Sequence, residues 1–446
     1  MIRLPSEIWL RIFAYATSVP VAFETTDPDI IAACALDAHG IVLHTQHRSS
    51  MHIKLAISLV CKTWHELGRQ FLFDYLLIKN GEQVMALSHI LSQNRIQEGL
   101  PPTPNDQSEG RRRQKSNYRP GWYTIRLEIA LEGCHVWSSS HTHALTSLMQ
   151  STPNLKVFST AFCAADAHLF HSDTYMQSLS HLAFLKCLKR LELRGEAKLI
   201  RDVVGMFGGQ EGLEVLWILP SRRILQTNGD DEDIHLPSLH TFISSFPYGS
   251  EFTRALKTPS LRSVVTENPV KYHRKSYVPD DRIRELGGQL QYLSLGSPLP
   301  FNINLILPSC PNLIELVLTC EAHRLQLAET TVPLSTLKRI TLHDYPILSV
   351  PNEHWSVPAD RLKASLSALI RQDIFPALEE VRLLLPFRSP TVAGGLNATD
   401  GGVHLWEDWL AECRARGVKV LVSRGAEEQV LGVWNEFVPV DVYFSI

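Results

Sequence analysis

The sequence predicts an α/β protein, with a short helical region at the N-terminus followed by a long array of parallel strands. A six-position phrase returns nine times between residues 153 and 385: leucine, two variable residues, an apolar residue, one variable residue and usually a second apolar residue. The first 80 residues instead carry apolar side chains at helical spacing. With 446 residues and 44% hydrophobic content, the chain has enough apolar material for a large core.

The first predicted helix opens with the sequence LPSEIWLRIF, from Leu4 to Phe13. Pro5 and Ser6 suit a helix start, since proline fits the first turn and serine can cap free backbone N–H groups. The apolar residues form two i,i+4 pairs, Ile8 with Ile12 and Trp9 with Phe13, which lie in adjacent stripes. We expect one stripe to pack internally and the other to be exposed or covered by a partner.

A second helical segment begins after a polar stretch at about residues 19–52. It reads KLAISLVCKTWHELGRQFLFDYLLI, with apolar residues at helical spacing from Leu55 to Leu67, and it ends in the strand-like run Leu76–Ile78. The pattern is helical again over residues 81–96. Residues 97–120 are rich in proline, glycine and charge, which predicts a disordered loop. The basic run RRRQK at 111–115 fits a solvated loop better than a nuclear-localisation signal.

The repeated phrase predicts short parallel strands, each followed by a segment that returns the chain beside the previous strand. Its first, fourth and sixth residues would enter the core, and no repeat can bury this face without its neighbours. The intervals between phrases lie mostly near the 20–29 residues of a leucine-rich repeat. The asparagine or cysteine usual after the strand is missing, so we expect an irregular solenoid. The leading leucines are residues 155, 188, 213, 239, 261, 290, 313, 337 and 378.

The N-terminal region resembles an F-box, and the whole chain resembles the F-box proteins with irregular leucine-rich repeats that are abundant in fungi. The first half of the F-box motif is matched by Leu4, Pro5, Glu7, Ile8, Ile12 and Phe13. The second half is matched by Leu59, Val60, Cys61, Lys62, Thr63 and Trp64. The chain departs from the family in the insert at about 19–52. The resemblance implies an F-box-like domain at 1–80, a first repeat helix at 81–96, the loop at 97–120 and repeats at 121–446.

This resemblance implies a non-catalytic role as the substrate-recognition subunit of a Skp–cullin–F-box (SCF) ubiquitin ligase. The F-box would bind the Skp-type adaptor of the cullin–RING ligase, and the repeats would bind an unknown substrate protein. The alternative is a leucine-rich-repeat interaction scaffold with a vestigial or ligase-independent F-box. The implied adaptor contacts are Leu4, Pro5, Ile8, Ile12, Phe13, Val60, Cys61 and Trp64, although any of them, Trp64 and Ile12 in particular, could belong to the core instead.

Substrate binding is expected on the concave face, where the variable strand residues of a solenoid point. Tryptophan, tyrosine and arginine are the residue types that anchor interfaces. The candidates are therefore Trp217, Tyr292, Arg339 and Arg382. For Trp217 the alternative is simple packing under an adjoining loop.

Other functions find little support in the sequence. No catalytic or phosphate-binding motif occurs, so we expect no enzymatic activity and no cofactor. A net charge of −3 predicts neither nucleic acid nor a membrane surface as a partner. Charged residues interrupt the first apolar stretch, and no apolar run is long enough to span a bilayer. The eight scattered cysteines indicate reduced thiols and a cytoplasmic or nuclear location. Cys134, His135, His141 and His143 lie close in sequence, but we expect surface residues there, not a metal site.

Overall fold

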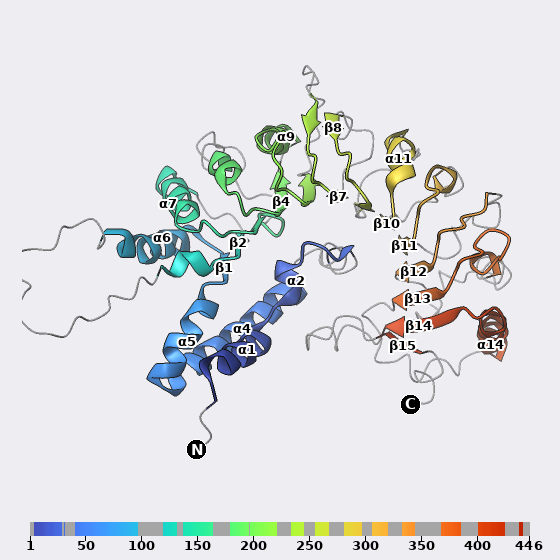
Figure 1. Cartoon of the computed structure of the whole chain (residues 1–446), viewed down its shortest axis with the longest axis horizontal. Helices are drawn as coiled ribbons and strands as arrows, with labels where there is room; N and C mark the ends of the chain where they lie inside the picture. Colours follow the sequence, from blue (N-terminus) through green and yellow to red (C-terminus); the bar gives the residue numbers. More distant parts are fainter. Residues whose placement is uncertain are drawn as a thin grey trace, which may run out of the picture. The chain divides into compact units, whose positions relative to one another are not determined.

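The protein is a mixed α/β structure that contains twelve parallel strands (Figure 1). The computed structural model describes residues 4–28, 31, 41–96, 119–131, 137–163, 179–195, 197–220, 233–244, 255–266, 281–296, 306–319, 332–343, 367–384, 400–423 and 437–439. Most of the segment predicted to be disordered, including the basic run, lies outside these residues. The chain divides into two compact units. Unit 1 comprises Met1–Asp27, Asp37–Asp230 and Ile234–Ser238, and unit 2 comprises Pro28–Leu36, Asp231–Asp233 and Leu239–Ile446.

Unit 1 contains five parallel strands whose order in the sheet follows the order in the chain. They are β1 (Tyr75–Ile78), β2 (Arg126–Ile129), β3 (Val157–Ser159), β4 (Arg190–Gly195) and β5 (Val215–Pro220), with the short β6 (Ile234–His235) after them. The register aligns Arg126 with Val157, and Val157 with Arg190. Equivalent positions of successive repeats therefore stand side by side.

The helices of unit 1 lie on both faces of these strands. Figure 1 places α7 and α9 on one side of strands β2–β4 and α2 and α4 on the other. Helices α1, α4 and α5 pack against one another at the N-terminal end, and α6 packs on α7. The bounds are α1 (Ser6–Thr17), α2 (Pro20–Phe23), α4 (Ile41–Val60), α5 (Lys62–Leu72), α6 (Gly81–Ile96), η1 (Pro120–Tyr123), α7 (Ser139–Gln150), η3 (His181–Phe184) and α9 (Ala197–Gly205).

Unit 2 continues the same pattern with seven parallel strands and one antiparallel strand at the end. The parallel strands are β7 (Thr241–Ser244), β9 (Ser263–Thr266), β10 (Tyr292–Gly296), β11 (Glu315–Thr319), β12 (Arg339–His343), β13 (Glu380–Leu384) and β14 (Lys419–Ser423). β15 (Phe437–Pro439) pairs with β14 in the antiparallel sense. The remaining elements are β8 (Leu256–Lys257), α11 (Asp281–Leu286), η4 (Gly287–Gln289), η6 (Leu307–Ser309) and α14 (Asp400–Ala415).

The repeated phrase predicted the strands correctly. A parallel strand occurs at each of its nine copies, and all nine leading leucines are buried. Strand β2 was missed, although Ile125, Leu127 and Ile129 alternate with polar residues in the way typical of a strand. None of the described helices combines the length and the apolar character needed to cross a bilayer.

A ladder of side-chain hydrogen bonds joins successive repeats at the residue just before the leading leucine. Asn154 Nδ2 donates to the carbonyl of Trp122 at 2.8 Å, and Asn312 Nδ2 donates to the carbonyl of Gly288 at 2.6 Å. Thr336 Oγ1 makes the equivalent bond to Pro311 at 2.7 Å. Leucine-rich repeats usually have an asparagine after each strand, which this sequence lacks. In these three repeats, a polar side chain just before the leading leucine makes the bond between repeats instead.

Replacing Gly121 by alanine is expected to lower the free energy of unfolding by about 1–3 kcal/mol. A Cβ atom at this position of η1 would lie 2.1 Å from the carbonyl oxygen of Ser151, so the two repeats would have to move apart. Gly205→Ala in α9 is the control, because its Cβ would meet nothing within 4 Å. It should be neutral or stabilise the chain by up to about 1 kcal/mol. Urea unfolding of the two variants measures the difference, and equal effects would contradict the close approach.

Candidate functional site

The first helix keeps one of its two apolar stripes inside the N-terminal helices. Trp9, Phe13 and Trp64 form an aromatic cluster between α1 and α5, with ring centroids 4.5 Å apart for Trp9–Trp64 and 4.9 Å apart for Phe13–Trp64. Phe13 is fully buried. This cluster gives α1 and α5 a shared core, and one of the two predicted stripes therefore packs internally.

The second stripe of α1 lies at the surface. Leu4, Ile8 and Ile12 are exposed, and Tyr15 continues the line with 90% of its surface exposed. The spacing of four and three residues places Ile8, Ile12 and Tyr15 on one face of the helix, and Leu4 lies just before its N-cap, Pro5. Exposed apolar residues in a row, in contrast to scattered single ones, are typical of a protein-interaction surface.

More apolar surface is exposed where α4 ends and α5 begins. Leu59 is 83% exposed, and Val60 and Cys61 follow it at the surface. Cys61 is the N-cap of α5, and its Sγ accepts a hydrogen bond from the backbone N–H of Trp64 at 3.5 Å. We call the exposed residues Leu4, Ile8, Ile12, Tyr15, Leu59 and Val60 the apolar surface of the N-terminal helices.

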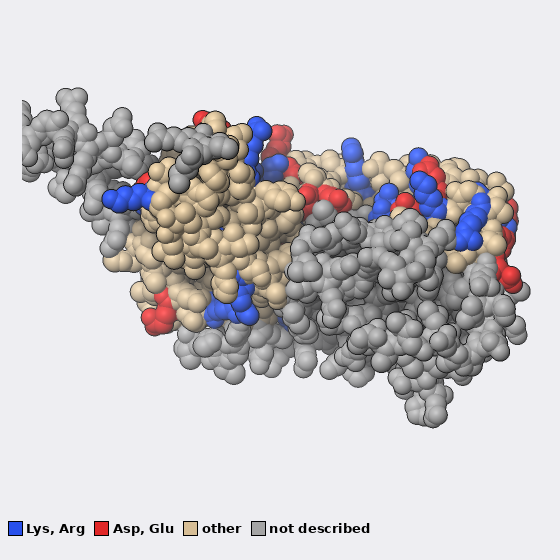
Figure 2. Space-filling view, turned by 90° about the horizontal axis from the view of Figure 1, so that it is seen from below, with Lys and Arg blue, Asp and Glu red and all other residues tan. Residues whose placement is uncertain are grey.

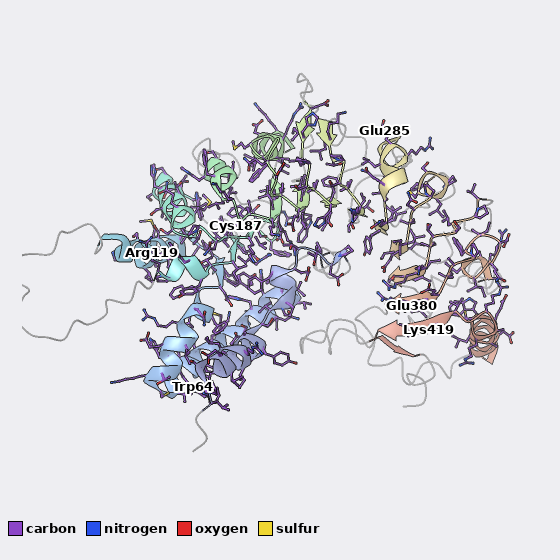
Figure 3. All side chains as sticks on the ribbon, viewed as in Figure 1. Trp64, Arg119, Cys187, Glu285, Glu380 and Lys419 are labelled. Atoms are coloured by element: carbon purple, nitrogen blue, oxygen red, sulfur yellow. The ribbon has the colours of Figure 1, made fainter. Side chains whose placement is uncertain are left out.

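Charged side chains are sparse on this part of the molecule. Figure 2 shows the unit 1 surface from below, where lysine, arginine, aspartate and glutamate lie mainly around the margins of a broad uncharged area. Figure 3 labels Trp64 in the same helical region. A low density of charge lowers the cost of removing water from this surface when a partner binds.

The predicted adaptor contacts divide into exposed and internal residues. Leu4, Pro5, Ile8, Ile12, Val60 and Cys61 are exposed, whereas Phe13 is buried and Trp64 is half-buried in the aromatic cluster. Phe13 and Trp64 therefore shape the helices and leave the surface to the others. Tyr15 and Leu59 were missing from the predicted contacts. The sequence could have indicated both: Tyr15 follows Ile12 at helical spacing, and Leu59 directly precedes Val60.

Helix α4 buries more polar than apolar side chains on its inner face, which is unusual for an amphipathic helix. Its buried face carries polar side chains, while its apolar residues Ile53, Leu55 and Leu59 are exposed. The buried residues follow one helical face: Leu43, Gln46, His47, Ser50, Lys54 and Ile57. This face needs polar partners in the protein, because an unpaired buried polar group costs free energy.

Strands β1 and β2 and the residue that precedes β1 supply those partners. Lys54 Nζ lies 2.6 Å from Asp74 Oδ1, and His44 Nε2 lies 2.5 Å from Glu128 Oε1. The ring of His47 packs against Tyr75 with centroids 4.1 Å apart. His44, His47 and Lys54 thus attach the inner face of α4 to the sheet, and Ser50 Oγ on the same face donates to the carbonyl of Thr17 on α1 at 2.6 Å.

Four charged residues on β2 and β4 form a fully buried network behind these contacts. The Arg126 guanidinium donates to Glu128 Oε2 at 2.6 Å and to both oxygens of Glu192, at 2.9 and 3.0 Å. Arg190 Nε lies 2.6 Å from Glu192 Oε1. Two positive and two negative charges balance within this network, which lowers the cost of burying them.

The chain between α1 and α4 covers the network with its backbone. Arg126 Nη1 donates to the carbonyl of Ala22 at 3.2 Å, and Arg190 Nη1 donates to those of Glu24 at 2.9 Å and Val21 at 3.4 Å. These residues belong to the insert that distinguishes the chain from the motif it resembles. The insert therefore joins the N-terminal helices to the strands of unit 1.

The network shifts the pKa values of the groups around it. Burial opposes ionisation of Glu128, but the nearby Arg126 and His44 outweigh it and lower its pKa to about 2. Burial, with Lys54 nearby, lowers the pKa of His47 to about 4. Burial raises the pKa of Asp74 despite its contact with Lys54. At neutral pH, His47 is therefore uncharged and Glu128 is ionised.

Acidification is expected to weaken unit 1 through His47 before it affects Glu128. The pKa of His47 is about 4 in the folded chain and 6.5 in the unfolded chain, so only the unfolded chain gains this proton as the pH falls between these values. Stability is then lost at about 1.4 kcal/mol per pH unit, roughly 3 kcal/mol in all. The Glu128 contribution is lost later, as the pH falls from 4.5 towards 2.

Urea unfolding of the wild type and of His47→Gln at several pH values measures this effect. Since glutamine does not titrate, the variant should lose less stability between pH 6.5 and pH 4. Parallel pH profiles for the two proteins would contradict the assignment of a neutral buried His47.

Two of the four predicted substrate contacts are not accessible. Trp217 and Tyr292 are buried, with 1% and 4% of their surfaces exposed, and Trp217 packs edge-on against Phe162 at 5.6 Å. The expectation that they line an open face is wrong, because both faces of these strands are covered. Arg339 and Arg382 retain partly exposed side chains.

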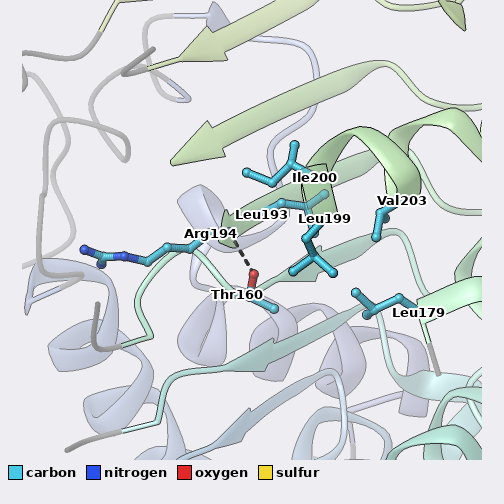
Figure 4. A pocket seen from close by; sticks show the side chains of 7 residues that line it. All are labelled: Thr160, Leu179, Leu193, Arg194, Leu199, Ile200 and Val203. Atoms are coloured by element: carbon cyan, nitrogen blue, oxygen red, sulfur yellow. Dashed lines mark hydrogen bonds between the residues drawn. The ribbon is translucent and has the colours of Figure 1, made fainter. Parts of the chain in front are cut away.

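A small hollow in unit 1 is a packing feature and not a ligand site. It lies beside β4 and α9, is lined mostly by aliphatic side chains such as Leu193 and Ile200, and has space for about one water molecule (Figure 4). Thr160 Oγ1 accepts a hydrogen bond from the Arg194 backbone N–H at 3.0 Å at its rim. Among the described residues, no cluster of histidine, cysteine, aspartate and glutamate side chains could hold a metal ion.

Comparison with known proteins adds no assignment for this chain. No protein-family model matches the sequence, and no curated protein matches it.

Proposed function

We propose that this protein is the substrate-recognition subunit of an SCF-type ubiquitin ligase, and that its apolar surface on the N-terminal helices binds a Skp-type adaptor. The observation that carries the proposal is the exposed row Leu4, Ile8, Ile12 and Tyr15, together with Leu59 and Val60. Five of these six residues belong to the F-box-like motif, Leu4, Ile8 and Ile12 to its first half and Leu59 and Val60 to its second. An adaptor with an apolar groove would cover them and remove them from water.

The packing of these helices supports this assignment. The Trp9–Phe13–Trp64 cluster allows them to fold before a partner arrives, so the apolar surface is available for binding. The inner face of α4 is held by Lys54–Asp74 and His44–Glu128, which orients the outer face away from the strands. An ordered apolar surface loses less conformational entropy on binding than a flexible one.

The strand array is the natural place for substrate binding. Repeats expose a long, continuous surface on which separate side chains can contact one partner. Of the four predicted substrate contacts, Arg339 and Arg382 on the later strands keep partly exposed side chains.

Reconstitution with a purified fungal Skp-type adaptor tests the proposal. The full chain and the adaptor are mixed and separated by size-exclusion chromatography, and the molar ratio is measured in the complex peak. We expect a stable one-to-one complex that also binds the N-terminal part of a cullin. If the folded chain elutes without adaptor, the proposal is wrong, and an interaction scaffold becomes the better interpretation.

A further inference from the structure

Strands β11, β12 and β13 of unit 2 carry a second cluster of charges on one face. Arg339 Nη1 lies 2.6 Å from Glu315 Oε2, and Arg339 Nε lies 3.1 Å from Glu380 Oε1. Arg382 Nε lies 2.5 Å from the same Glu380 oxygen. Lys419 on β14 is paired in register with Glu380, and Figure 3 shows both residues on these neighbouring strands. We call Glu315, Arg339, Glu380, Arg382 and Lys419 the charged face of unit 2.

These residues occupy the same strand positions as the buried network of unit 1. Arg190 and Glu192 stand two and four residues after the leading leucine at 188, and Glu380 and Arg382 stand two and four residues after that at 378. In unit 1, β2 and β4 each carry arginine followed by glutamate and are separated by β3, whereas in unit 2 the adjacent strands β11, β12 and β13 carry Glu315, Arg339 and Glu380 in register. The two clusters are thus versions of one arrangement that differ in the order of the charges.

The unit 1 version shows what such an arrangement can bind. There, glutamates lie against the guanidinium groups of Arg126 and Arg190, and Nη1 of each arginine donates to the backbone, Arg126 to the carbonyl of Ala22 and Arg190 to those of Val21 and Glu24. The ligand is a short stretch of polypeptide that crosses the strands. Its recognition depends on main-chain oxygens and not on one particular side chain.

The unit 2 version remains accessible. The side chains of Arg126 and Arg190 are completely buried, whereas those of Arg339 and Arg382 are 34% and 17% exposed, and Lys419 is exposed. Glu315 and Glu380 orient the two guanidinium groups in advance, which lowers the entropy lost on binding. With three positive and two negative charges, the face has a surplus of one positive charge.

We infer that the charged face of unit 2 binds an extended segment of a partner polypeptide, whose main-chain carbonyls accept hydrogen bonds from Arg339 and Arg382. The surplus charge favours a segment with an acidic side chain next to Lys419. This inference rests on the proposed function in one respect only: the proposed function is what makes the bound polypeptide a substrate of the ligase.

Selection from a display library of random peptides on the immobilised full chain tests the inference. We expect enrichment of extended, acidic peptides. Their affinity should fall about 10-fold or more in Arg339→Ala and in Arg382→Ala, because each change removes charged hydrogen bonds. Arg339→Lys and Arg382→Lys keep the charge but lose the forked donor geometry, so they should also weaken binding.

Lys338→Ala is the matched control. Lys338 is the neighbour of Arg339 and pairs with Glu379 at 3.0 Å, but its side chain is on the other side of the strand. It should leave peptide affinity unchanged. The inference is overturned if no peptide is enriched, if folded arginine variants bind the enriched peptides as well as the wild type, or if the arginine variants change the oligomeric state and reveal a second copy of the chain on this face.

Adaptor binding by the same preparations separates this inference from the proposed function. The arginine variants should still form the adaptor complex. If the wild type binds peptides through Arg339 and Arg382 but binds no adaptor, only the proposed function fails.

Discussion

Leu59→Asp is expected to abolish adaptor binding and to leave the chain folded. Leu59 is 83% exposed, so an aspartate there remains in water in the free protein and has little effect on its stability. In the complex the carboxylate would be buried against apolar groups without a partner, which costs several kcal/mol. We expect the dissociation constant of the adaptor complex to rise at least about 100-fold. Ile8→Asp should act in the same way from α1.

Phe184→Asp is the matched control for both substitutions. Phe184 is a large apolar residue that is 78% exposed, but it lies on η3, outside the apolar surface of the N-terminal helices. Titration calorimetry with the adaptor measures the affinities, and thermal unfolding measures folding. Equal affinities for Leu59→Asp, Phe184→Asp and the wild type would show that the adaptor does not bind this surface.

Arg126→Met is expected to lower the free energy of unfolding by about 3–5 kcal/mol. Methionine fills much of the volume of arginine but leaves the buried carboxylates of Glu128 and Glu192 without their shared cation. The carbonyl of Ala22 also loses its donor, which weakens the attachment of the N-terminal helices to β2. The energetic penalty comes mainly from buried charge that is no longer balanced.

Lys189→Met provides the comparison, at the residue just before β4. Lys189 Nζ lies 2.6 Å from Glu214 Oε1, as close as the Arg126 pair, but its side chain is 43% exposed. Its loss should cost no more than about 1 kcal/mol. Urea unfolding of both variants measures the difference, and similar effects would contradict the idea that the Arg126 network is shielded from solvent.

The part of the fold that depends on local pattern was predictable. Leu313 and Leu337 begin phrases whose spacing already specifies a strand and a buried face, because alternation along the chain decides which side chains share a face. The two stripes of α1 were predictable for the same reason: Ile8 and Trp9 must diverge on a helix whatever they contact. The exposed row of the candidate site follows from that geometry.

Contacts between segments far apart in the sequence were decided only by the tertiary structure. Nothing near Arg126 or Glu192 in the sequence indicates that the backbone at Ala22 covers the network they form. The polar inner side of α4 is a similar case: Lys54 is buried because Asp74 faces it, and Leu59 is exposed because the inner face is already occupied. Periodicity identifies the faces of an element, but burial depends on which other element reaches each face, and that is decided when the chain packs.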